Sequence, residues 1–128
     1  MIKYIFLAAG GAIGTVFRYS LSGYTYRVTG GIFPWGTLAV NSLGSFLIGA
    51  LWGLFEMEDL PPQARNFLFI GVLGGFTTFS SYALETMNLF REGELKLAFF
   101  NVLASNMLTL VLVCGGFLLA RYLINHMK

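Results

Sequence analysis

Residues 74–81, Gly-Gly-Phe-Thr-Thr-Phe-Ser-Ser, concentrate the side chains of this chain that are suited to handling an ion. The two glycines weaken a helix, and the hydroxyls are uncharged hydrogen-bond donors. The segment lies within a long apolar stretch, where a membrane-spanning helix is normally continuous. Backbone groups freed by a break at that depth are tolerated only inside protein or along a wet cavity. We therefore predict that this segment breaks the third spanning helix and is the functional centre.

Polar residues also recur at every fourth position in the second and fourth apolar stretches, a spacing that places them on one face of a helix. The two stripes are Thr37-Asn41-Ser45 and Asn101-Ser105-Thr109, with Asn106 beside the second. Such groups either join helices by hydrogen bonds worth about 0.6–2 kcal/mol each or line a hydrated pathway. Two stripes beside a broken helix favour the pathway.

The chemistry of these residues favours an anion. Glu85 is the only acid in a spanning stretch, whereas a cation or proton transporter normally places carboxylates at mid-membrane. Phe76 and Phe79 add ring edges, which are the positive part of an aromatic ring. Their spacing puts both rings on one face if the segment is helical. Packing against protein or lipid is the other interpretation of these two rings.

The break has a second consequence for cations. If residues 74–77 are not helical, their carbonyls lack partners, and a dehydrated monovalent cation such as Na⁺ satisfies carbonyls of this kind in unwound helices. In an antiparallel dimer, two such breaks would meet on the two-fold axis. An ion held there would be structural rather than transported.

The composition predicts the helices that hold these side chains. Of 128 residues, 56% are hydrophobic and 11% are charged, whereas a soluble domain carries about a quarter charged residues. Four apolar stretches reach the roughly 20 residues that cross a ~30 Å hydrocarbon core. We predict a single-domain, all-α membrane protein, residues 1–128, with spanning helices at about 4–22, 36–55, 67–90 and 97–124.

The basic residues of the short loops give no orientation. One side would hold Lys3, Arg65, Arg121 and Lys128, and the other Arg27, Arg91 and Lys96, with Arg18 near it. Because the positive-inside rule counts only Lys and Arg, this balance leaves two interpretations. Either the bias is weak and other factors decide, or the chain inserts both ways and pairs as an antiparallel homodimer.

Several function classes lack support in the sequence. The net charge of +2 is too small to indicate nucleic acid as a partner. Neither a nucleophile–base pair nor a Cys/His cluster is evident, and no Lys follows Gly74-Gly75 as in a phosphate-binding loop. We therefore do not expect an enzyme.

Three groups of residues resemble the fluoride channel family known as Fluc or CrcB. They are Gly11-Ala12-Ile13-Gly14-Thr15 with Arg18-Tyr19, Gly36-Thr37-Leu38 with Asn41, and Gly74-Gly75-Phe76-Thr77-Thr78-Phe79-Ser80. The third group is highly specific, and the resemblance covers nearly the whole chain.

The resemblance implies a dual-topology antiparallel homodimer in the cell (inner) membrane that passively exports F⁻ from the cytoplasm and so lowers fluoride toxicity. It implies that Phe76 and Phe79 line the pores by their edges and that Asn41 donates to the ion. It also implies that the backbone carbonyls of Gly74 and Thr77 hold a structural Na⁺ at the dimer interface. Further expected pore residues are Thr37, Ser80, Ser105 and Thr109, and expected vestibule residues are Arg18 and Glu85.

Elementary ion chemistry agrees with this implication. Fluoride is small and strongly hydrated, so a pore must replace its water with donors that do not hold the ion too tightly. Neutral amides, hydroxyls and ring edges are such donors.

Two other functions remain open. A small multidrug-type exporter is also a four-helix chain, but that class resembles proteins with a membrane-embedded Glu in helix one, where this chain has only Arg18. A non-transporting membrane scaffold would use the hydroxyl stripes to join its helices.

Overall fold

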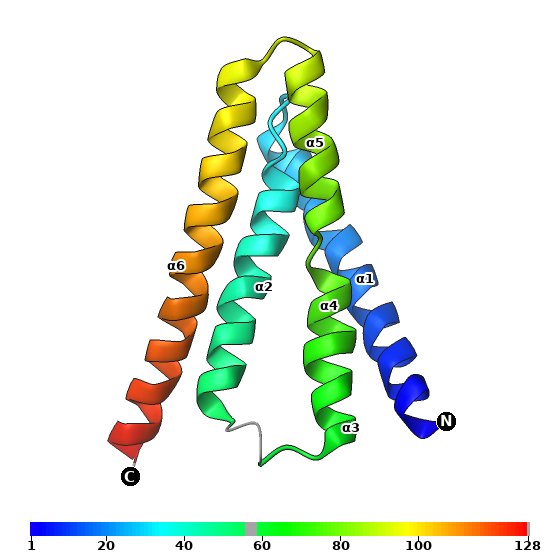
Figure 1. The fold of residues 1–128 in the computed structure, drawn as a ribbon, viewed down its shortest axis with the longest axis vertical. Helices are drawn as coiled ribbons and strands as arrows, with labels where there is room; N and C mark the ends of the chain where they lie inside the picture. Colours follow the sequence, from blue (N-terminus) through cyan, green and yellow to red (C-terminus); the bar gives the residue numbers. More distant parts are fainter. Residues whose placement is uncertain (56–58, 128) are drawn as a thin grey trace.

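The computed structural model describes residues 1–55 and 59–127, so the expected charge at Lys128 and the beginning of the loop after residue 55 lie outside the described part. Four helical segments are long and apolar enough to cross a membrane: Ile2–Thr29, Trp35–Leu54, Pro62–Arg91 and Leu95–Met127. The two termini lie at the same end of the bundle (Figure 1). The predicted multi-pass, all-α fold is confirmed.

The first helix, α1 (Ile2–Thr29), continues past the expected end at Ser22. Residues 24–29 contain no Gly or Pro that would end the helix. The hydroxyl of Thr25 donates to the carbonyl of Leu21, so this polar side chain is hydrogen-bonded within the helix. α1 ends at Gly30, where φ is 61°, a conformation that glycine adopts without strain. The first loop is therefore much shorter than the segment 23–35 that composition suggested.

The remaining long helices lie near their predicted positions. α2 covers Trp35–Leu54 and α6 covers Leu95–Met127, so α6 extends beyond the expected 97–124 at both ends. The third span consists of α3 (Pro62–Arg65), the π-helical segment η1 (Asn66–Leu73), α4 (Gly74–Phe76) and α5 (Phe79–Arg91).

The break in the third span lies at Thr77–Thr78, within the predicted segment 74–81, and among residues 74–77 only Thr77 is not helical. Gly74 and Gly75 are helical, whereas Thr77 has ψ 155° and Thr78 has φ −149°, both extended. Two adjacent β-branched residues tolerate extended backbone well. Thr78 then starts α5, because its Oγ1 accepts from the backbone N–H of Ser81 at 3.2 Å, the usual role of a threonine N-cap.

Glycines bring pairs of helices into backbone contact. On α1, a β-carbon at Gly14 would overlap the carbonyl oxygen of Val72 in η1, and one at Gly75 of α4 would lie 2.7 Å from the carbonyl oxygen of Gly11. On α2, a β-carbon at Gly49 would overlap the carbonyl oxygen of Val113 in α6. The third span therefore packs through its first half on α1, and α2 packs on α6.

Candidate functional site

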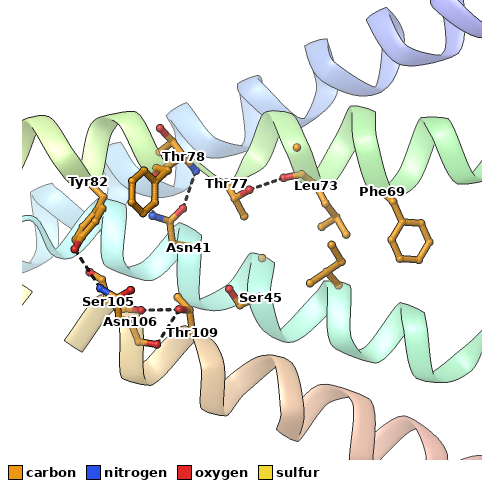
Figure 2. Close-up of a pocket in the computed structure, with 14 residues that line it drawn as sticks. Asn41, Ser45, Phe69, Leu73, Thr77, Thr78, Tyr82, Ser105, Asn106 and Thr109 are labelled. Atoms are coloured by element: carbon orange, nitrogen blue, oxygen red, sulfur yellow. Dashed lines mark hydrogen bonds between the residues drawn. The ribbon is translucent and has the colours of Figure 1, made fainter. Parts of the chain in front are cut away.

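Two residues of each polar stripe and the residues of the break meet in one pocket between α2, α5 and α6 (Figure 2), whereas Thr37 and Asn101, the first residue of each stripe, lie outside it. Its volume is about 370 Å³. Residues from the first half of the third span, among them Leu73, form an apolar wall. The polar residues that line this polar pocket are Asn41, Ser45, Thr77, Thr78, Tyr82, Ser105, Asn106 and Thr109. Among the described residues, none that lines it is charged.

Asn41 holds the break open. Its Oδ1 accepts from the backbone N–H of Thr78 at 2.7 Å, and its Nδ2 donates to the carbonyl oxygen of Thr78 at 2.8 Å. The Oδ1 of Asn41 thus replaces the helical acceptor that the N–H of Thr78 has lost, and Nδ2 adds a second bond to a carbonyl that, as the N-cap carbonyl of α5, already accepts within that helix. Figure 2 shows Asn41 pointing from α2 to this residue. This clamp makes an extended residue tolerable at membrane depth, where an unpaired backbone group would be costly.

The α6 wall of the polar pocket is also hydrogen-bonded. Asn106 donates from Nδ2 to the hydroxyl of Tyr82 at 3.2 Å and to the carbonyl of Val102 at 2.8 Å. Thr109 donates to the carbonyl of Ser105 at 2.6 Å. These bonds fix the wall, and the Asn106–Tyr82 bond joins α6 to α5.

The break separates the two phenylalanines. Phe79 is 76% exposed, lines the polar pocket and packs against Tyr82, with ring centroids 5.1 Å apart and ring planes inclined by 59°. Phe76 is 6% exposed and lines an apolar pocket with residues of α1 and α2, among them Phe17 and Leu43. The two rings therefore do not share a helix face, because the extended pair between them changes the direction of the chain.

Thr37 and Glu85 belong to a second polar cluster, away from the polar pocket toward the end of α5. Thr37 is 6% exposed and donates to Oε1 of Glu85 at 2.7 Å, and the hydroxyl of Tyr26 donates to the same oxygen at 3.1 Å. Glu85 and Tyr26 line a further pocket that also contains Glu92. The carboxylate is thereby held by two neutral donors.

Four other predicted residues lie as follows. Gly74 and Thr77 line the polar pocket. Ser80 is exposed, and its Oγ is 3.3 Å from Oγ1 of Thr78. Arg18 is half-buried on α1, a helix that contributes none of the described residues lining the polar pocket.

Tyr82 and Tyr26 are the site residues that sequence reasoning missed. Tyr82 lies four residues after Thr78, so helical spacing from the break would have placed it on the same face. Tyr26 carried no such signal, because it falls in the part of α1 that composition assigned to a loop.

Comparisons with known proteins agree on one family. Residues 5–117 match the family described as "CrcB-like protein, Camphor Resistance (CrcB)". The chain is 48% identical over 128 residues to a protein of Parabacteroides distasonis, covering 100% of both chains. It is 48% identical over 124 residues to a protein of Agrobacterium fabrum, covering 96% of this chain and 99% of the relative. Both relatives carry the name fluoride-specific ion channel FluC.

Proposed function

The chain belongs to the CrcB family of membrane proteins, and from this membership we propose that it is a fluoride-selective channel. It lets F⁻ leave the cytoplasm passively across the cell membrane and so lowers fluoride toxicity. The polar pocket is part of the conduction path.

The observation that carries this proposal is the set of neutral donors in the polar pocket. Asn41 has a second Nδ2–H besides the one that Thr78 takes, and Tyr82 accepts from Asn106, which leaves its own hydroxyl proton to donate. An anion meeting these groups exchanges water for amide and hydroxyl donors without an ammonium or guanidinium that would retain it. The edge of Phe79 adds a weak positive potential at the mouth of the pocket.

The size of the polar pocket supports an assembly of two chains. A volume of about 370 Å³ accommodates roughly ten waters at ~30 Å³ each, so the pocket of one chain alone has room for an ion together with its hydration water. Phe79 lies at this pocket, directly after the break in the third span, with 76% of its surface exposed. A second, oppositely oriented copy that covers this face would narrow the path, and the balanced loop charges allow both orientations.

A structural Na⁺ between the two copies fits the backbone at the break. In a continuous helix the N–H groups of Thr78 and Ser81 would donate to the carbonyls of Gly74 and Thr77. Here they donate to Asn41 Oδ1 and Thr78 Oγ1 instead. These two carbonyls are the groups that would hold the ion. The same carbonyls of both copies would coordinate one Na⁺, which would link the two chains at their breaks.

The proposed function is tested by F⁻ efflux from liposomes that contain the purified protein. We expect F⁻ to leave and Cl⁻ to be retained. Phe79→Ile should lower F⁻ flux at least about tenfold, since the ring edge is lost where the ion passes. Phe99→Ile is the matched control, because Phe99 is 67% exposed on α6 and lies outside the polar pocket. A folded wild-type protein without F⁻ flux would favour a scaffold instead.

The assembly is tested separately. A tag at the C-terminus should be accessible from both sides of the membrane, and access from one side only would reject the antiparallel dimer. The Na⁺ proposal predicts a higher melting temperature of the dimer in NaCl than in choline chloride, and equal temperatures would contradict it.

A further inference from the structure

Asn101 is the most deeply placed polar side chain of the described part of α6. It is 1% exposed, and it does not line the polar pocket. Its Nδ2 donates to Oγ1 of Thr86 on α5 at 2.8 Å, and its Oδ1 accepts from Oγ of Ser105 at 3.3 Å. Asn101 therefore connects Ser105, which lines the polar pocket, to Thr86 on α5.

The orientation of the Asn101 amide is determined by Thr86. The hydroxyl proton of Thr86 is used on the carbonyl oxygen of Tyr82 at 2.8 Å. Thr86 Oγ1 can then only accept from Asn101, so Nδ2 must face Thr86. The oxygen Oδ1 must consequently face Ser105, which makes the Ser105 hydroxyl the donor of that pair.

Ser105 differs from its neighbours in this respect. Thr86 and Thr109, like Thr25 on α1, donate to the backbone carbonyl four residues earlier at 2.6 to 2.8 Å. Such a bond occupies the hydroxyl proton within the helix. Ser105 donates instead to the side chain four residues earlier, and 3.3 Å is long for a bond between two oxygens. The hydrogen bond from Ser105 is thus weak, and the hydroxyl can easily donate to another acceptor instead.

We propose that Asn101 is a positioning residue that keeps the hydroxyl proton of Ser105 available to an anion in the polar pocket. Asn101 draws this proton away from the backbone carbonyl of residue 101. When an anion enters the pocket, the Ser105 hydroxyl donates its hydrogen bond to the anion in place of Asn101 Oδ1. When the ion leaves, the hydroxyl donates to Asn101 again. Thr86 supports the exchange by preventing the amide from turning over. The inference deepens the proposed function and rests on it.

The test is a double-mutant cycle on F⁻ efflux from liposomes. Ser105→Ala should lower flux about tenfold, and Asn101→Leu about fivefold, because a hydrogen bond to a charged group is lost fully in the first variant and in part in the second. In the Ser105→Ala background, Asn101→Leu should have no further effect. A crystal structure of Asn101→Leu should place Ser105 Oγ within hydrogen-bond distance of the carbonyl oxygen of residue 101.

A second pair of variants tests the same idea without changing the buried amide. Thr86→Val keeps the shape of the side chain but removes the acceptor of Nδ2, so it should lower flux as Asn101→Leu does. Thr86→Ser retains the hydroxyl and should conduct like the wild type. This pair decides the question even if Asn101→Leu does not fold.

The outcomes separate this inference from the proposed function. Wild-type protein without F⁻ flux would refute the proposed function and this inference with it. Wild-type flux together with an unchanged Asn101→Leu variant would overturn the inference alone. Equal fold-losses for Asn101→Leu in the wild-type and Ser105→Ala backgrounds would also overturn it, since they would indicate that Asn101 only joins two helices.

Discussion

The two halves of the third span, before and after Thr77–Thr78, are held to the bundle by different interactions. The first half, η1 with α4, meets α1 through glycines, so that Gly14 and Gly75 lie against opposing backbone. The second half, α5, is held by side-chain hydrogen bonds. Its bonded residues Thr78, Tyr82, Glu85 and Thr86 lie on one face, and their partners come from α1, α2 and α6.

This difference follows from the solvent. Lipid gives little hydrophobic driving force between helices, so close packing and polar side chains must hold them together. Backbone contact at glycines has one geometry and offers no hydrogen-bond donor to an anion. Hydrogen bonds between neutral side chains can be exchanged for bonds to an anion one at a time. The first half of the span is therefore the rigid support, and the second half carries the exchangeable donors.

The largest effect should come from the glycine contacts. In Gly14→Ala, the new β-carbon would overlap the carbonyl oxygen of Val72 and lie 2.8 Å from the backbone nitrogen of Phe76. Backbone cannot turn aside as a side chain can, so we expect the free energy of unfolding in detergent to fall by about 3 kcal/mol or more. Gly11→Ala is the control, because a β-carbon there meets open space. Equal stability of the two variants would refute the glycine contact.

A smaller but clear loss should follow from Asn41→Leu. The variant leaves the N–H of Thr78 without its partner, whereas the Thr78 carbonyl keeps its bond within α5, and one unsatisfied buried group costs about 1–3 kcal/mol. The measurement is again the free energy of unfolding. Ser45→Ala, one turn further along the same stripe, should lose much less, and similar losses for both would mean that Asn41 does not hold the break.

The smallest effect is predicted at the second polar cluster. Tyr26→Phe removes the donor 3.1 Å from Glu85 Oε1 but leaves the shorter bond from Thr37. We expect the free energy of unfolding to change by less than about 1 kcal/mol. Thr37→Val should change it more, because Thr37 is buried and its bond is 2.7 Å long. The opposite order would show that Tyr26 is the main support of the carboxylate.

The local patterns of the sequence were sufficient to predict the four spans, the two polar stripes and a break in the third helix. Apolar length and four-residue spacing depend only on neighbours along the chain. The same reasoning did not separate Gly74 and Gly75, which are helical, from the break at Thr77–Thr78, because a glycine serves equally to loosen a helix and to let another helix approach. Only the position of α1 decides that Gly75 is a contact and that the break falls on the two threonines.

The partners of each polar face were likewise beyond the sequence. Spacing placed Asn41 and Ser105 on faces of their own helices, but nothing local indicated that Asn41 would clamp Thr78, or that Asn101 would stand behind Ser105. Which residues share a face of a helix can be derived from residue spacing alone, since helical periodicity is fixed by the backbone. The tertiary structure decided which faces meet, since that depends on how closely whole helices approach, and this approach places Phe79 at the polar pocket and Phe76 in an apolar one.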